Sequence, residues 1–201
     1  MSVHSALILA GGESRRFGGP KALVKIAGRP LIAHVAEAMA SLAGETIVSV
    51  GAAGGEAGIR PVLPDARFAF DVRHDRGPIE GFNEGFPMAR GNLVLVAPCD
   101  APLLRPALYR LLLEVLGDHD AAVPALDVPD PVRAVYRREP VMAVLEASSS
   151  VRSPSALVDR LDCVHVSPDQ LRGVDPDLSS FVDVNTQIDL DDVLQRMGPP
   201  K

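Results

Sequence analysis

The chain has 201 residues, of which 47% are hydrophobic and 23% are charged, as is usual for one soluble globular domain. Its net charge of −6 at pH 7 argues against a general nucleic-acid-binding or membrane-surface protein, because both need a basic face. The two cysteines, Cys99 and Cys163, form no C-x-x-C motif, which argues against a disulfide framework or a zinc site. No apolar run approaches the ~20 residues of a membrane-spanning helix, so we expect a cytoplasmic protein.

The first half of the chain alternates short apolar runs with helical patterns. Almost continuous apolar residues predict buried strands at residues 5–10, 46–50, 68–72 and 92–97. Apolar residues at helical spacing predict helices at residues 31–44, 79–89 and 104–116. Gly44 is expected to close the first helix, whereas Gly81, Gly85 and Pro87 are expected to interrupt the second.

The second half of the chain is less regular. Its patterns predict strands at residues 121–125, 133–136 and 163–166, and helices at residues 140–147, 155–161 and 187–197. Thr186 is the expected N-cap of the last helix. The alternation of strands and helices predicts a three-layer α/β/α, Rossmann-like fold with a mostly parallel sheet. Ligands bind beyond the carboxyl ends of the strands in such folds, so the loops after Ala10 and Ala97 are the expected site.

The loop after the first predicted strand has the composition of a phosphate-binding site. Residues 11–19 contain four glycines, which permit positive φ and let backbone N–H groups approach an anion closely. Arg15, Arg16 and Lys21 add positive charge to the same loop. The spacing matches neither a G-x-G-x-x-G fingerprint nor a Walker loop, since Lys21 follows Pro20 and precedes neither Ser nor Thr. The pattern predicts a triphosphate site of another kind, the alternative being a solvated loop with an incidental basic cluster.

Asp100 lies just past the apolar run at residues 92–97. A carboxylate in this place is suited to hold Mg²⁺ against nucleotide phosphates, because Mg²⁺ takes only one or two protein carboxylates and keeps its other sites for phosphate and water. The alternative is an Asp that caps the following helix. The glycine-rich loop favours the interpretation that Asp100 binds a metal ion over the interpretation that it caps the helix. We interpret the adjacent Cys99 as a small buried hydrophobe rather than a nucleophile.

The stretch L-A-G-G-x-S-x-R-x-G-x-x-K-x-L at residues 9–23 resembles the signature loop of the molybdenum cofactor guanylyltransferases, which have a nucleotide-diphospho-sugar transferase-like fold. Phe17 departs from the Met that this family more often has. The resemblance implies that the loop backbone and its cations bind the nucleotide, at Leu9, Ala10, Gly11, Gly12, Arg16 and Lys21. It further implies that Arg16, Lys21 and Asp100 carry catalysis, with Asp100 as the ligand of the Mg²⁺ cofactor.

A second segment, residues 71–81, is similar to the D-x(n)-G-P-L-x-G element of the same family. By this resemblance, Gly77 and Pro78 contact the base and ribose of the nucleotide. The resemblance also implies that Asp71 or Asp75 accepts hydrogen bonds from the guanine N1–H and 2-amino group. The spacing to the Gly-Pro pair leaves open which of the two carboxylates does so.

Residues 183–186 (D-V-N-T) resemble the N-x-N-T element of the family, which implies that Asn185 contacts the metal or the acceptor. Asp183 is a departure, because cytidylyltransferase relatives more often have Asp in this place; the first loop, by contrast, is of the guanylyl type. Arg133 and Arg152 fall where the family holds its pterin acceptor. They are expected to bind its terminal phosphate, the alternative being solvated surface arginines.

The resemblance implies a single nucleotidyltransferase domain over residues 1–201, with a nucleotide-binding half at about 1–120 and an acceptor-binding half at about 121–201. The implied reaction transfers GMP from Mg-GTP to the terminal phosphate of molybdopterin, releases pyrophosphate and forms the guanine dinucleotide form of the molybdenum cofactor. A CTP-dependent or other phospho-acceptor nucleotidyltransferase and a catalytically silent nucleotide-binding module are the alternatives. The expected partners are GTP, molybdopterin and, transiently, molybdenum-cofactor-handling proteins, but neither nucleic acid nor membrane.

Overall fold

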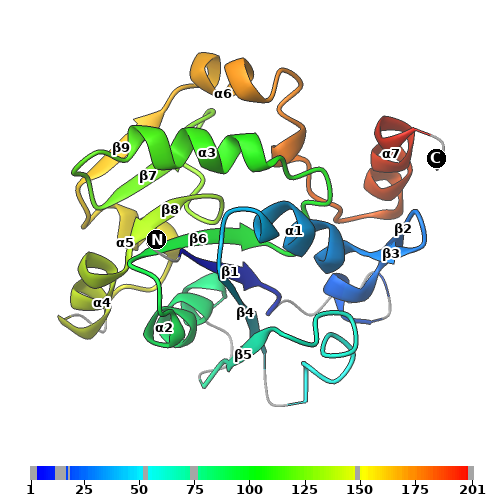
Figure 1. Cartoon of the computed structure of the whole chain (residues 1–201), viewed down its shortest axis with the longest axis horizontal. Helices are drawn as coiled ribbons and strands as arrows, with labels where there is room; N and C mark the ends of the chain where they lie inside the picture. The colour runs from blue at the N-terminus through cyan, green and yellow to red at the C-terminus, as the bar shows by residue number, and fades with distance from the viewer. Residues whose placement is uncertain are drawn as a thin grey trace.

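The computed structural model describes residues 4–11, 17, 19–51, 54–72, 77–147 and 150–198. These residues form a seven-stranded sheet in the order β5-β4-β1-β6-β8-β7-β9 and a two-stranded hairpin, β2-β3 (Figure 1). The strands are β1 (Ser5–Leu9), β2 (Lys25–Ile26), β3 (Arg29–Pro30), β4 (Glu45–Val50), β5 (Arg67–Phe70), β6 (Leu93–Pro98), β7 (Ala121–Pro124), β8 (Val135–Arg137) and β9 (Cys163–Val166). The central strands are rich in Val, Ile, Leu and Ala, as a sheet that is covered on both faces requires.

The central strand β1 pairs in parallel with β4 on one side and with β6 on the other. In this register Leu9 lies opposite both Ser49 and Pro98, so the carboxyl ends of the three strands meet at one edge of the sheet. Strand β8 is antiparallel to its neighbours β6 and β7, and the other strand pairs of the sheet are parallel. The predicted α/β class with a mostly parallel sheet is therefore confirmed.

Helices cover both faces of the sheet in a three-layer α/β/α arrangement. They are α1 (Leu31–Ala40), α2 (Pro78–Met88), α3 (Pro106–Val115), α4 (Arg138–Ala147), α5 (Pro154–Val158), α6 (Pro168–Val174) and α7 (Gln187–Met197), with short 3-10 helices η1 (Lys21–Leu23) and η2 (Ser179–Phe181). Helices α1, α3 and α6 share one core with Ala6 and Ile8 of β1. Helices α2, α4 and α5 share the other core with Leu7, since successive strand residues point to opposite faces.

The C-terminal helix α7 lies beside the β2-β3 hairpin (Figure 1). Leu190 and Val193 of α7 pack with Ile26 of the hairpin in a third, smaller core. Thr186 and Asp189 form a capping box at the start of α7, in which each side chain accepts a hydrogen bond from the backbone N–H of the other residue. The prediction of this helix and of its N-cap is confirmed.

Some predicted boundaries differ from the structure. Helix α1 ends at Ala40 rather than at Gly44. Helix α2 is continuous although it contains Gly81, Gly85 and Pro87; Pro87 lies in its last turn, and the two glycines let the helix approach the sheet. A Cβ atom at Gly85 would lie 2.5 Å from a methyl carbon of Leu7 in β1. Helix α6 was not predicted, because Leu171 and Val174 are the only aliphatic residues among its seven, too few to show helical periodicity.

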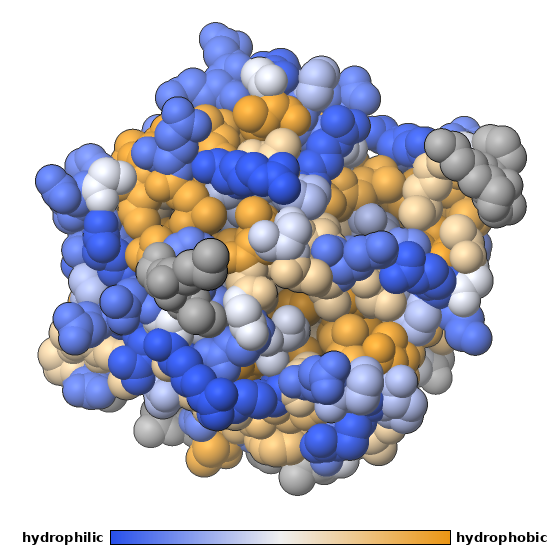
Figure 2. Space-filling view, in the orientation of Figure 1, coloured by the Kyte–Doolittle hydropathy of each residue, from blue (hydrophilic) through white to orange (hydrophobic). Residues whose placement is uncertain are grey.

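The surface combines a hydrophilic exterior with small apolar patches. On the face shown in Figure 2, hydrophilic residues cover much of the outline and hydrophobic residues gather between them. Two exposed apolar side chains lie on α7, Ile188 at 80% and Leu194 at 39% exposure. Within the described ranges, no helix is both long and apolar enough to span a membrane. The apolar residues are thus concentrated on the two faces of the sheet and under α7.

Tyr109 ties α3 to the sheet. It is fully buried, and its hydroxyl donates a hydrogen bond of 2.6 Å to the carbonyl oxygen of Val96 in β6. Because Tyr109→Phe removes this donor and leaves a buried carbonyl without it, we expect the free energy of unfolding to fall by about 1–3 kcal/mol. Urea unfolding followed by circular dichroism measures the change. Glu114→Gln, an exposed change on the same helix, is the control; a Tyr109→Phe variant as stable as this control would contradict the prediction.

Candidate active site

A cleft lies at the edge of the sheet where the carboxyl ends of β1, β4 and β6 meet. Its volume is about 200 Å³. The lining residues come from the strand ends, the start of η1, the start of α2 and the turn before β8. They are Leu9, Gly11, Lys21, Ser49, Asp71, Gly77, Pro78, Gly81, Pro98, Cys99, Asp100 and Val132. The structure therefore brings together, at one cleft, most of the described residues that the sequence predicts for nucleotide and metal binding.

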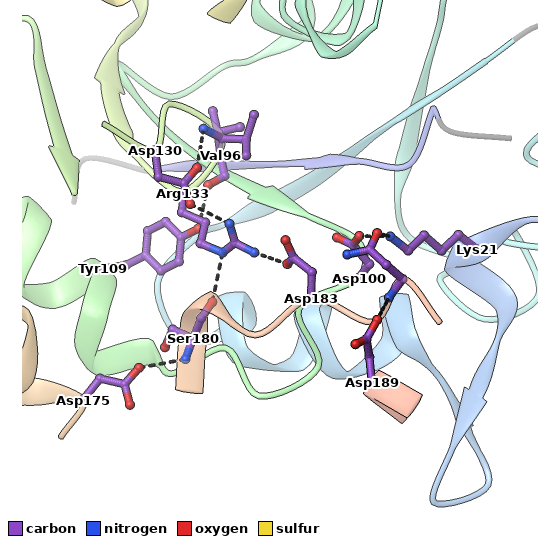
Figure 3. Close-up of polar contacts among 12 residues, drawn as sticks. Lys21, Val96, Asp100, Tyr109, Asp130, Arg133, Asp175, Ser180, Asp183 and Asp189 are labelled. Atoms are coloured by element: carbon purple, nitrogen blue, oxygen red, sulfur yellow. Dashed lines mark hydrogen bonds and ion pairs between the residues drawn. The ribbon is translucent and has the colours of Figure 1, made fainter. Parts of the chain in front are cut away.

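Lys21 and Asp100 line this cleft and lie next to each other in Figure 3, and Asn185 contacts Lys21. The Lys21 ammonium group forms an ion pair with the Asp100 carboxylate and donates a hydrogen bond of 2.6 Å to the side-chain oxygen of Asn185. The side chains of Lys21 and Asp100 are only 18% and 15% exposed. Lys21 begins η1, Asp100 follows β6, and Asn185 lies just before α7. Three segments that are remote in sequence thus place one cation and two oxygen groups side by side.

The segment that carries Asn185 is attached to the site through its main chain. The Val184 N–H donates a hydrogen bond of 2.9 Å to the carbonyl oxygen of Asp100. The N–H groups of Asn185 and Thr186 each donate a hydrogen bond of 2.7 Å to the Asp189 carboxylate. Asn185 is therefore held between the end of β6 and the start of α7.

The oxygen groups of this cluster fit a hard divalent cation. Asp100 supplies a carboxylate and Asn185 an amide oxygen, and Mg²⁺ is commonly held by one or two carboxylates together with phosphate and water. Over the part of the chain that the structure describes, no three His, Cys, Asp or Glu side chains group as a metal site. The donor set thus suits a metal ion that binds together with nucleotide phosphates.

Gly11 lies against the Asp71 carboxylate. A Cβ atom at Gly11 would lie 3.0 Å from Asp71 Oδ2, so the missing side chain is what lets the carboxylate approach this loop. The Ser49 hydroxyl donates a hydrogen bond of 3.3 Å to Asp71 Oδ1. The Asp71 N–H donates to the carbonyl oxygens of Val50 and Gly51. The end of β4 therefore holds Asp71 at the cleft.

Helix α2 begins at the cleft. Gly77 precedes it with a φ of 66°, a left-handed conformation that favours glycine, and Pro78 takes the first helical position. The N–H groups and the dipole of this helix end favour an anion. A Cβ atom at Gly81 would lie 2.7 Å from both the Ser49 hydroxyl oxygen and a methyl carbon of Leu9. Gly81 therefore lets α2 form the wall of the cleft close to β1 and β4.

Arg133 is buried, with 4% of its surface exposed. Its guanidinium group forms ion pairs with Asp130 and Asp183 and donates a hydrogen bond of 2.9 Å from Nε to the carbonyl oxygen of Ser180 (Figure 3). Burial lowers the pKa of Arg133, but the two carboxylates outweigh it and raise this pKa. Burial raises the pKa of Asp183 to about 6 against the opposing effect of Arg133. These contacts of Arg133 are with the protein itself, and its contact with an acceptor phosphate stays a prediction.

The remaining predicted residues lie away from the cleft or outside the described residues. Arg152 is exposed and lies between α4 and α5. In Figure 1 these two helices lie at the end of the sheet opposite the arrowhead of β6. Ala10 continues β1 and donates a backbone hydrogen bond to the carbonyl oxygen of Ser49. Gly12, Arg16 and Asp75 lie outside the described residues.

Sequence reasoning did not single out Ser49, Gly81 or Val132 as cleft residues. Ser49 carries a usable signal, because it is a polar residue between two valines in a strand and is 2% exposed. Gly81 was interpreted as a helix interruption, whereas in the structure it prevents a collision. Val132 carries no local signal, since its place at the cleft depends on how the turn before β8 folds back.

The thiols are expected to be unreactive in the folded protein. Cys99 lines the cleft but is only 6% exposed. Burial raises the pKa of Cys99 to about 12, and the charge of Asp100 acts in the same direction. Burial likewise raises the pKa of Cys163 to about 11. Because the thiolate is the reactive form, we expect iodoacetamide at about pH 8 to label both cysteines at least about tenfold more slowly in the native protein than in urea. Mass spectrometry measures the labels, and rapid native labelling of Cys99 would contradict this account.

Comparison with known proteins agrees with this geometry. Residues 6–171 match the family model of the MobA-like NTP transferase domain. The chain is 32% identical to a probable molybdenum cofactor guanylyltransferase of Methanosarcina acetivorans, over 95% of this chain and 90% of that protein. It is 31% identical to a molybdenum cofactor guanylyltransferase of Desulfosudis oleivorans, over 95% of this chain and 94% of that protein.

Solved structures show the same fold. The crystal structure of molybdopterin-guanine dinucleotide biosynthesis protein A from Archaeoglobus fulgidus has a TM-score of 0.78 and 25% identity, covering 96% of this chain and 98% of that one. The 4-diphosphocytidyl-2C-methyl-D-erythritol synthase of Anaerococcus prevotii has a TM-score of 0.75 at 16% identity, covering 98% of this chain and 99% of that one; this likeness concerns the fold alone. The chain belongs to the MobA-like NTP transferase domain family and is a nucleotidyltransferase.

Proposed function

We propose that this nucleotidyltransferase transfers GMP from Mg-GTP to the terminal phosphate of molybdopterin. Pyrophosphate is released, and the guanine dinucleotide form of the molybdenum cofactor results. The observation that carries the proposal is the meeting of Gly11, Lys21, Asp71 and Asp100 at one cleft. The names of the relatives, at 32% and 31% identity over nearly the whole chain, support the choice of this reaction.

The reaction is an in-line attack by an acceptor phosphate oxygen on the α-phosphorus of GTP. The bond from the α-phosphorus to the bridging oxygen breaks, and pyrophosphate leaves with the electron pair. Preorganised cations stabilise the charge that develops on the phosphates. Lys21 supports this role, because its ammonium group lies at the cleft beside the end of β6. Arg16 is proposed as a second cation, and the backbone of Gly11 and Gly12 as the cradle of the triphosphate.

Asp100 and Asn185 are the groups that would hold Mg²⁺, which supplies positive charge to the phosphates when it is bound. Lys21 neutralises Asp100 in the structure, so the site keeps its charges paired before the nucleotide enters. A phosphate monoester has its second pKa near ~6, and the acceptor is therefore largely deprotonated at neutral pH. A dedicated general base is not required, and catalysis consists of positioning and charge neutralisation.

Asp71 is proposed to read the guanine base. Its carboxylate stands at the cleft and is held there by the Ser49 hydroxyl. A carboxylate accepts hydrogen bonds but donates none, which matches the two donors of guanine, N1–H and the 2-amino group. Gly77 and Pro78 line the same cleft and are proposed as contacts to the base and ribose.

The two halves of the chain have different proposed tasks within one domain over residues 1–201. The nucleotide-binding half covers about residues 1–120 and the acceptor-binding half about residues 121–201. The second half reaches the cleft through Val132, which lines it, and through Asn185, which contacts Lys21. This arrangement supports an acceptor that approaches the nucleotide from the side of the second half.

Nucleotide choice tests the proposed reaction. Pyrophosphate release is measured with Mg²⁺ and molybdate-loaded molybdopterin, with GTP, CTP, ATP and UTP offered separately. We expect release with GTP, because Asp71 complements its base edge. Release with CTP instead would indicate the cytidylyl alternative, in agreement with Asp183. No release with any of the four nucleotides would refute the proposed function and favour a silent nucleotide-binding module.

Asp100→Asn and Lys21→Met test the proposed site. Each removes one charge while keeping most of the side-chain volume, and each is expected to lower turnover at least about 100-fold, because the lost charge stabilises the transferring phosphates. Circular dichroism checks that the variants are folded. Arg29→Met is the control, since Arg29 forms an exposed ion pair with Glu37 outside the cleft. Wild-type turnover in a folded Asp100→Asn or Lys21→Met variant would contradict the assignment of that residue.

A further inference from the structure

Arg133 joins two segments that are far apart in sequence. From the turn before β8, Asp130 accepts a hydrogen bond of 2.5 Å from Nη1. From the segment before α7, Asp183 pairs with Nη2 and the carbonyl oxygen of Ser180 accepts from Nε at 2.9 Å. The guanidinium carbon also lies 5.7 Å from the centre of the Phe181 ring. Each nitrogen of the guanidinium group is therefore bound to the protein, in three directions that a planar fork satisfies at once.

The segment that Arg133 holds continues directly into the active site. Asp183 precedes Val184, whose N–H donates a hydrogen bond of 2.9 Å to the carbonyl oxygen of Asp100. The next residue is Asn185, whose side chain accepts a hydrogen bond of 2.6 Å from Lys21. Figure 3 shows Asp183 between Arg133 on one side and the pair of Asp100 and Lys21 on the other. A shift of Asp183 therefore moves the groups that face the phosphates.

Arg133 also controls the charge next to the metal-binding carboxylate. Asp183 lies close to Asp100, because the adjacent Val184 donates its N–H to the Asp100 carbonyl oxygen, and Figure 3 shows the two carboxylates next to each other. Arg133 compensates the Asp183 charge by a direct ion pair. A partly buried carboxylate that loses the cation with which it is paired is destabilised. Without Arg133, Asp183 would therefore compete with Asp100 for Lys21.

We propose that Arg133 is a positioning residue of the transfer reaction, a role that rests on the function proposed above. Arg133 binds Asp183 and the Ser180 carbonyl to the turn at Asp130. It thereby keeps Asn185 and the main chain at Asp100 in place around Lys21. In this role Arg133 acts through the protein groups that its guanidinium nitrogens bind.

Arg133→Met is the main test, and Arg67→Met is the matched control. Arg67 also binds a carboxylate and a backbone carbonyl, Glu45 at 3.0 Å and Met88 at 2.7 Å, but it stands at the start of β5, away from the cleft. Both variants are expected to melt at a lower temperature than the wild type. At a temperature where all three proteins are folded, only Arg133→Met should lose kcat, by about 100-fold, because small misplacements of reacting groups cost that much. The KM for GTP should change less than about threefold, since the glycine-rich loop is untouched.

Arg133→Lys and a double variant separate positioning from simple stability. Lys keeps the positive charge but lacks the planar guanidinium group that binds three partners at once. The kcat of Arg133→Lys should therefore lie between those of Arg133→Met and the wild type. Arg133→Lys also serves in place of Arg133→Met if that variant does not fold. In Arg133→Met/Asp183→Asn, the loss of kcat should be no larger than in Arg133→Met alone, because residues that act as one unit are not additive. Two results would overturn the proposal. One is a double variant whose loss of kcat equals the product of the losses in the two single variants. The other is an Arg133→Met variant whose kcat lies within about threefold of the wild type.

Hydrogen–deuterium exchange tests the positioning role of Arg133 without depending on the proposed enzymatic activity. Peptides that cover residues 179–186 are expected to exchange at least about tenfold faster in Arg133→Met than in Arg67→Met, because opening of the Val184 hydrogen bond becomes easier. Unchanged exchange would overturn the proposal whatever the enzyme does. A wild-type protein that releases no pyrophosphate with any nucleotide would refute the proposed function, and the exchange would then decide by itself whether Arg133 holds the segment.

Discussion

The parallel pairing of β1 with β4 on one side and with β6 on the other decides where the rest of the site can lie. Parallel strands end at the same edge of a sheet, so the residues that follow them become neighbours whatever their distance in sequence. Lys21 and Asp100 are 79 positions apart and form an ion pair across this edge. The hydrogen bond from Val184 to Asp100 brings the C-terminal segment to the same place. The parallel pairing of these strands thus brings residues of the candidate site together from distant parts of the chain.

Lys21 and Arg133 are each paired with carboxylates in the structure. The chain carries a net charge of −6, so the triphosphate of the proposed reaction needs local cations that are held in place. Lys21 is held by Asp100 and Asn185, and the charge of Arg133 is taken up by its two carboxylate partners. The two cations therefore have different surroundings: Lys21 lines the cleft, whereas Arg133 is buried. In the proposed reaction, Lys21 is the group that an acidic protein presents to the phosphates by a local arrangement of charge.

Much of the fold and part of the site follow from local patterns. The strands around Leu7 and Val96 and the capped helix after Thr186 are predicted because continuous apolar runs and capping residues are local signals. The ends of helices are less predictable, since α1 stops at Ala40, before the expected glycine. The glycines of α2 led to the wrong prediction that this helix is interrupted, because glycine weakens an isolated helix. In the structure, Gly81 and Gly85 instead let the helix pack closely against the sheet without a steric clash.

The sequence by itself determined the α/β class, the glycine-rich and basic composition of the first loop and the position of Asp100 after a buried strand, because composition and spacing express these features directly. Only the tertiary structure decided which polar residues turn inward. From the sequence, Arg133 is either a contact of the acceptor phosphate or a solvated surface arginine, yet the fold buries it against Asp183, a residue 50 positions away. Ser49 reads as one polar residue of a strand, yet the fold sets its hydroxyl against Asp71. The surroundings of a side chain depend on contacts between distant segments, and neighbouring residues in the sequence carry no record of them.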